Sequence, residues 1–151
     1  MGNDGILGAF AGHAVLAKLS DRHKLLLASG ARAYVAAAGE FLARQEDASH
    51  TFYLVRRGRV AMSVRTLDGP VEVTTVGTGE VVGWSWLIPP HRWQFDCRAV
   101  EAVEAVAFDA EWLREKCEQD ASLGYHLLQG LVGVLSSRLA ATREQLVQAR
   151  K

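Results

Sequence analysis

A cluster of aromatic side chains around one fixed positive charge is the feature of this sequence best suited to ligand chemistry. Trp84, Trp86 and Trp93, three of the 4 tryptophans of the chain, lie close together with Arg92 among them. Indole rings stack on planar groups, and a guanidinium donates paired hydrogen bonds to a phosphate or carboxylate. Gly83, at the start of the segment, could expose backbone N–H groups to an anion. One interpretation of the segment is a binding site for a flat ligand. The alternative is that the indole rings fill the core while Arg92 stays in solvent.

Catalytic and metal-binding patterns, by contrast, are missing from the sequence. It contains no Gly-x-Ser-x-Gly elbow, no phosphate-binding P-loop and no dinucleotide fingerprint. The 5 histidines form no His-x-His or His-Glu-x-x-His pair, and the 2 cysteines lack the Cys-x-x-Cys spacing of zinc sites. We therefore expect a protein that is not an enzyme, has no metal site and carries Cys97 and Cys117 as inert thiols.

Composition and charge restrict the class of protein further. The chain has 151 residues, 49% of them apolar, and this length suits a single hydrophobic core. Its 17 basic and 17 acidic residues give a formal net charge of zero, so nucleic-acid binding by this chain alone is not expected. No apolar stretch is long enough to span a bilayer, and the first residues do not have the pattern of a signal peptide. A reduced, cytoplasmic protein without a membrane partner is the expectation.

Three regions differ in the periodicity of their apolar residues. Residues 1–30 have a helical pattern, with Ser20 as the N-cap of a helix that ends at Gly30. Residues 31–109 alternate between apolar and polar positions and contain glycine turns, as short antiparallel strands do. Residues 110–151 return to helical spacing. We expect a mainly β fold: a jelly-roll β-barrel with N-terminal helices and a long C-terminal dimerisation helix.

The last region predicts a short helix capped by Asp109 and a long helix that begins at Asp120 or Ser122. Two apolar stripes run along the long helix. The first is spaced alternately by three and four residues, as in a coiled coil, and consists of Tyr125, Leu128, Val132, Leu135, Leu139, Thr142 and Leu146. The second could pack on the barrel and consists of Leu127, Leu131 and Val134. We expect a homodimer through the first stripe; the alternative is a monomer in which both stripes form one broad core-facing surface.

Three stretches of the sequence together resemble a known family. They are Ala38-Gly39-Glu40-Phe41-Leu42, Phe52-Tyr53-Leu54-Val55-Arg56-Arg57-Gly58-Arg59-Val60 and Val76-Gly77-Thr78-Gly79-Glu80-Val81-Val82-Gly83. With the order of helices and strands, they make the chain similar, over about residues 13–147, to the cyclic nucleotide-binding domain of the catabolite activator protein superfamily. The resemblance implies a jelly roll with a phosphate-binding cassette, in which a Glu holds the ribose and an Arg pairs with the cyclic phosphate.

The cassette of this chain departs from the family pattern at both of those positions. Gly83 matches the cassette glycine, but Trp84 stands in place of the Glu and Trp93 in place of the phosphate-binding Arg. Arg92 lies one residue early, and in a strand such an offset turns a side chain to the opposite face. Thr142 matches the long-helix threonine with which the family contacts the base. The expected ligand-binding residues are Gly83, Trp84, Ser85, Trp86, Arg92, Trp93, Gln94 and Thr142.

These features favour a non-enzymatic, ligand-sensing regulatory domain for a cyclic nucleotide or another small planar ligand, with nucleotide binding altered or lost. The alternative is a degenerate domain that acts as a dimerisation or docking module for an effector protein. A haem sensor with His91 or Cys97 as axial ligand is a third, disfavoured interpretation. Transcription factors of the superfamily continue into a helix-turn-helix, whereas this chain ends at Lys151, so we expect no DNA-reading helix in it. Whether the tryptophans leave a pocket open or fill it separates the first two interpretations.

Overall fold

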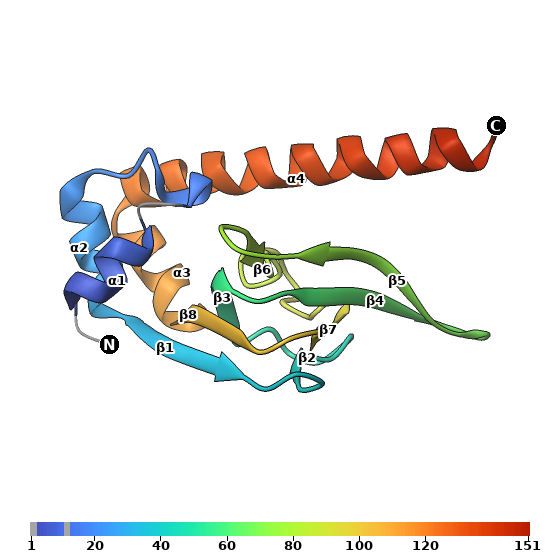
Figure 1. Cartoon of the computed structure of the whole chain (residues 1–151). Helices are drawn as coiled ribbons and strands as arrows, with labels where there is room; N and C mark the ends of the chain where they lie inside the picture. The colour runs from blue at the N-terminus through green and yellow to red at the C-terminus, as the bar shows by residue number, and fades with distance from the viewer. Residues whose placement is uncertain (1–2, 11–12) are drawn as a thin grey trace.

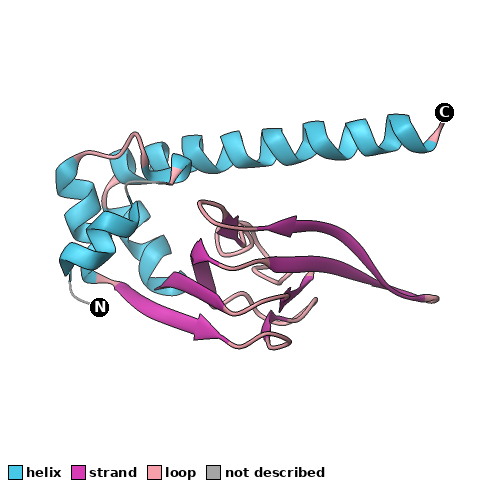
Figure 2. Cartoon of the chain, viewed as in Figure 1, coloured by secondary structure: helices cyan, strands magenta, loops and turns pink. Residues whose placement is uncertain are grey.

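Two four-stranded antiparallel sheets form the centre of the molecule, and most of the helical segments gather at one end of it (Figure 1, Figure 2). The computed structural model describes residues 3–10 and 13–151. One sheet has the strand order β1-β8-β3-β6 and the other β2-β7-β4-β5. The strands are β1 (Ala31–Ala36), β2 (Phe41–Ala43), β3 (Thr51–Arg57), β4 (Val60–Thr66), β5 (Gly69–Val76), β6 (Val81–Val82), β7 (Asp96–Ala99) and β8 (Val103–Asp109). The predicted mainly β fold with flanking helices is confirmed, and the arrangement is consistent with a jelly roll.

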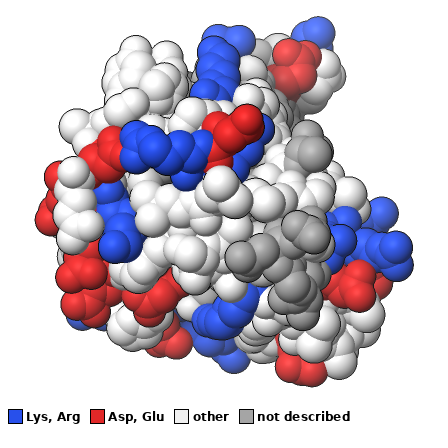
Figure 3. Space-filling model, turned by 90° about the vertical axis from the view of Figure 1, so that its left-hand side faces the viewer, with Lys and Arg blue, Asp and Glu red and all other residues white. Residues whose placement is uncertain are grey.

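The N-terminal segment covers one end of the sheets with short helical elements. They are α1 (Asn3–Phe10), the 3₁₀ turn η1 (Ala14–Leu16) and α2 (Asp21–Ser29). Ser20 Oγ accepts a hydrogen bond from His23 N at 3.2 Å, and Gly30 directly follows the last residue of α2. Both predicted ends of α2 are confirmed, because caps depend on neighbours along the chain. Figure 3 shows this end of the molecule, where basic and acidic side chains are interspersed and do not form one large patch.

The C-terminal region forms two helices, α3 (Ala110–Gln119) and α4 (Ala121–Ala149). Asp109 Oδ1 accepts a hydrogen bond from Trp112 N at 2.8 Å, and Asp120 Oδ1 accepts one from Leu123 N at 3.3 Å. Asp109 therefore caps α3 as predicted, and of the two candidates for the start of α4 the structure selects Asp120.

Helix α4 runs from the helical end of the molecule along one side of the sheets (Figure 1). Leu127 and Leu131 are each only 2% exposed, and Val134 packs against the same buried cluster, so the second stripe packs inward as predicted. The first stripe is different, because its large apolar side chains are exposed to solvent; they are Tyr125, Leu128, Val132, Leu135, Leu139 and Leu146. In this chain the two stripes do not form one core-facing surface.

Buried apolar side chains form two clusters on either side of the sheet that contains β3. The first lies between this sheet and the helices and includes Phe52, Trp86 and Phe108. The second lies between the two sheets and includes Val60, Met62, Trp93 and Cys97. Strand periodicity explains the division, since neighbouring residues such as Phe52 and Tyr53 on β3 point to opposite faces. Among the described residues, no helix is both long enough and apolar enough to cross a membrane.

Candidate ligand-binding cassette

The predicted cassette is the loop of residues 83–95, which follows β6 and leads into β7. Gly83 opens the loop with a φ of 93°, a left-handed backbone conformation that glycine adopts without strain. A Cβ atom at this position would lie 2.7 Å from the Trp93 ring, which is closer than two carbon atoms can approach without moving. The position therefore requires glycine, and an indole occupies the space beside the cassette glycine.

Trp93 lies in the core between the two sheets. Its side chain is 5% exposed, and its ring stacks on Tyr53 with 6.4 Å between the ring centroids. The backbone is held on both sides: Trp93 N donates to Asp47 O at 2.9 Å, and Glu46 N donates to Trp93 O at 2.9 Å. The residue that we expected from the sequence at the position of the phosphate-binding Arg is thus an apolar ring fixed in the interior.

Trp86 lies in the other cluster, on the helical side of the barrel. It is 0% exposed, and its ring lies 5.5 Å from that of Phe52. Arg114, on α3, donates from Nη1 to Trp86 O at 2.7 Å, so the loop is tied to the helical layer at this point. The indole Nε1 is buried without a hydrogen-bond partner among the described residues. Trp86 therefore faces the helical layer, away from the cavity that the cassette encloses.

Trp84 is half-buried and contacts a side chain that the sequence analysis did not include, Arg138 of α4. The Arg138 guanidinium lies 4.9 Å from the Trp84 ring centroid, and its Nη2 donates to Val81 O at 2.8 Å. Burial lowers the pKa of Arg138, because a low-dielectric environment disfavours its charged form. The sequence does contain a signal for this contact: Arg138 continues the inward stripe of Leu127, Leu131 and Val134 at helical spacing.

The cavity lined by the cassette residues is very small. Its volume is about 10 Å³, and it is lined by Met62, Gly83, Trp84, Ser85, Trp93, Gln94 and Phe95. A space of this size holds no more than about one water molecule, whereas small-molecule sites occupy roughly 300–1,000 Å³. The structure therefore brings five of the eight predicted ligand-binding residues together, but around a space of only about 10 Å³.

The other three predicted residues do not line this cavity. Trp86 is in the helical-side core. Arg92 is exposed and donates from Nη1 to Glu46 O at 2.8 Å, so its guanidinium is directed toward a loop carbonyl. Thr142 is exposed on α4, beyond the part of the helix that packs on the core.

Both cysteine thiols have a raised pKa. Burial raises the pKa of Cys97 to about 12 and is the main cause that raises the pKa of Cys117 to about 11.

Neither residue nominated as a haem ligand, His91 or Cys97, lines the cassette cavity. In the described part of the chain, no group of three or more His, Cys, Asp or Glu side chains could hold a metal ion.

Comparison with known proteins assigns this chain to a family. The family model of the cyclic nucleotide-binding domain matches residues 35–120. The match covers more than half of the chain, which therefore belongs to the cyclic nucleotide-binding domain family, as the sequence resemblance indicates. No curated protein matches the chain by sequence.

Solved structures resemble the chain in fold at low sequence identity. A putative cyclic nucleotide-binding protein of Geobacter metallireducens has a TM-score of 0.80 at 21% identity, over 92% of this chain and 98% of that one. The catabolite activator protein of Thermus thermophilus has a TM-score of 0.71 at 22% identity, over 91% of this chain and 63% of that one. The regulatory subunit of a cAMP-independent protein kinase A from Trypanosoma brucei has a TM-score of 0.67 at 19% identity, over 78% of this chain and 48% of that one. At these identities the likeness concerns the fold.

Proposed function

We propose that this chain is a dimeric regulatory module whose nucleotide cassette is closed by its own side chains and which acts through contacts with proteins. The observation that carries the proposal is the cassette cavity of about 10 Å³, together with the burial of Trp93, which we expect from the sequence to stand at the position of the family's phosphate-binding Arg. A cyclic nucleotide would have to displace Trp93 from the core between the sheets. It would also find Trp84 at the position where the family Glu holds the ribose.

The electrostatics of the cassette support the same proposal. A buried phosphate that loses one charged partner loses roughly 2–5 kcal/mol of binding free energy, which is about thirtyfold to several thousandfold in affinity. Arg92 is directed toward Glu46 O, and Arg138 donates to Val81 O while it stacks on Trp84. The protein kinase A relative from Trypanosoma brucei, which is described as cAMP-independent, is compatible with a domain of this fold that responds to something other than cyclic AMP.

Calorimetric titration of the purified protein with cyclic AMP and cyclic GMP tests the closed cassette. We expect no saturable heat at micromolar concentrations of either nucleotide, because the phosphate and the ribose both lack their family partners. A nucleotide-binding domain of the same family, titrated under the same conditions, serves as the positive control. Binding at micromolar affinity or tighter would mean that Arg92 or backbone amides replace the missing partners, and would restore the ligand-sensing interpretation.

The exposed face of α4 supports dimerisation in this proposal. Its apolar side chains continue along the helix well beyond the buried residues Leu123, Leu127 and Leu131, and Leu139 is 70% exposed. A continuous apolar face of this kind is costly to leave in water and is typical of a surface that pairs with another helix. In the proposed homodimer, the α4 helices of two copies pair through this face.

The double variant Leu135→Lys with Leu139→Lys is expected to be monomeric. Each leucine that is buried in an interface contributes about 2 kcal/mol, and each new lysine would place a charge in the seam. Light scattering measures the mass. The matched control is Ser137→Lys with Ala140→Lys, which adds the same charges at exposed positions on other faces of α4 and should leave the dimer intact. An unchanged mass for the leucine variant would rule out pairing through this face.

A further inference from the structure

A second and much larger depression lies on the outer face of the sheet β2-β7-β4-β5. Its volume is about 800 Å³, and none of its lining residues lines the cassette cavity. We call it the arginine basin, because three arginines line it: Arg44, Arg65 and Arg98. Phe41, Glu72 and Val100 also belong to its lining. Strand alternation explains its position, because Ala61 and Ser63 face outward on β4 while Val60 and Met62 are buried between the sheets.

An exposed aromatic ring in the basin lies close to two guanidinium groups. Arg44 Cζ lies 4.0 Å from the Phe41 ring centroid, and Arg98 Cζ lies 5.6 Å from the same centroid. Arg98 also donates from Nε to Gly39 O at 3.0 Å, which restricts its side chain. Phe41 is 41% exposed, so the ring and the guanidinium groups are together accessible to a partner.

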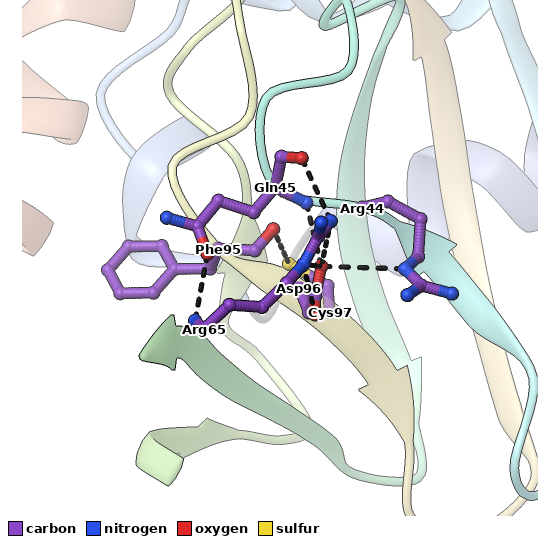
Figure 4. A network of polar contacts seen from close by, with 6 residues as sticks. All are labelled: Arg44, Gln45, Arg65, Phe95, Asp96 and Cys97. Atoms are coloured by element: carbon purple, nitrogen blue, oxygen red, sulfur yellow. Dashed lines mark hydrogen bonds and ion pairs between the residues drawn. The ribbon is translucent and has the colours of Figure 1, made fainter. Parts of the chain in front are cut away.

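A nearly buried carboxylate holds the other side of the basin in place (Figure 4). Arg65 donates from Nε to Asp96 Oδ2 at 3.2 Å and from Nη2 to Asp96 Oδ1 at 3.1 Å, while Arg44 Nε lies 3.5 Å from Asp96 Oδ1. Gln45 N donates to the same carboxylate at 2.7 Å. The hydrogen bond from Arg65 is the main cause that lowers the pKa of Asp96. Arg44 and Arg65 nevertheless remain 49% and 50% exposed, so they are positioned by Asp96 and still face solvent.

We propose that the arginine basin docks an acidic peptide segment of a partner protein. The inference rests on the proposed function, in which the chain acts through protein contacts, and it names the chemistry of the partner. Positioned guanidinium groups pair with carboxylates at little further loss of side-chain entropy. Arg and aromatic residues together are typical of the energetically dominant part of protein interfaces. Val100, which is 51% exposed, adds an apolar contact beside the charges.

The shape and charge of the basin favour a peptide over a small anion. The basin has a volume of about 800 Å³, which is far more than a small anion fills. Its lining contains three arginines and only two carboxylates, those of Asp96 and Glu72. The Asp96 carboxylate already accepts hydrogen bonds from Arg65 and from Gln45 N. A peptide that carries both carboxylates and an apolar side chain would use the arginines and the Phe41 ring at once.

The test is an NMR titration of the whole chain with a blocked pentapeptide of sequence Glu-Glu-Leu-Glu-Glu. We expect saturable shifts of the backbone amides around Gly39, Phe41 and Arg98, and weaker binding as salt rises. Arg98→Glu should weaken binding about tenfold or more. Phe41→Ala, which removes none of the side chains that contact Asp96, should weaken it as well. The matched control is Arg32→Glu, which makes the same charge reversal at an exposed position of the other sheet and should leave binding unchanged.

Three results would overturn the assignment. Absence of saturable shifts in the basin at millimolar peptide would show that it does not dock acidic segments. Equal weakening by Arg32→Glu would show that the peptide responds to overall charge. Inorganic phosphate that saturates the same amides as tightly as the peptide would identify a small-anion site instead. Each of these outcomes is independent of the cyclic nucleotide titration. The proposal for the basin can therefore be contradicted while the proposal for the cassette is retained, and the other way round.

Discussion

Replacing Trp93 with Ala is expected to lower the free energy of unfolding by about 3–5 kcal/mol. The ring is 5% exposed, stacks on Tyr53 and lies against Gly83, so its removal leaves a cavity in the core between the sheets. Urea denaturation followed by circular dichroism measures the change. Gln94→Ala is the control, because Gln94 is the exposed neighbour of Trp93 and should change stability by no more than about 0.5 kcal/mol.

The variant Trp93→Ala allows a second, independent measurement, the binding of free indole. A cavity with the shape of an indole, lined by apolar groups, binds a matching apolar molecule. Free indole should therefore raise the melting temperature of Trp93→Ala and leave that of the unchanged protein as it is. If Trp93→Ala were no less stable than Gln94→Ala, the ring would contribute nothing to the core, and Trp93 would again be a candidate for stacking on a ligand.

Trp86→Ala is expected to have a comparably large effect, again about 3–5 kcal/mol. Trp86 is 0% exposed and packs against Phe52 in the cluster that joins the loop to the helices. Trp86→Phe should cost clearly less, because it keeps an aromatic ring beside Phe52 and removes a buried Nε1–H that has no partner among the described residues. Burying such a donor costs about 1–3 kcal/mol.

The free energies of unfolding of the two Trp86 variants are measured side by side by chemical denaturation. A Phe variant as unstable as the Ala variant would contradict this account, since it would mean that the Nε1–H makes a stabilising contact. A small loss in both variants would place the ring outside the core altogether.

Much of the fold could be predicted from the sequence because the relevant interactions are local. Ser20, Asp109 and Asp120 cap helices by bonding to backbone N–H groups three residues away. The alternation of residues 31–109 indicates strands because side chains on a strand point to opposite faces in turn. The inward stripe of Leu127 and Leu131 follows from the helical repeat in the same way. The departure of the cassette from the family pattern is a prediction that rests on the order of residues alone.

The environment of the tryptophans, by contrast, was decided only by the tertiary structure. Trp86 enters the helical-side core, Trp93 enters the core between the sheets, and Trp84 is half-buried beneath a residue of α4. Residues 83–95 contain no helix and no strand, so they have no periodicity from which the direction of a side chain could be inferred. The sequence therefore left open whether these rings face a ligand or fill the interior.

Contacts between distant parts of the chain explain the rest of what the sequence did not reveal. Arg138 meets Val81 across a separation of 57 residues, and the arginine basin combines side chains from β2, the loop after β2, β4, β5 and β7. By itself the sequence determined the helical and strand regions and the family, because those depend on residue type and short-range order. The filled cassette and the grouping of the arginines depend on how the sheets and α4 pack, because packing brings together residues that no spacing along the chain relates.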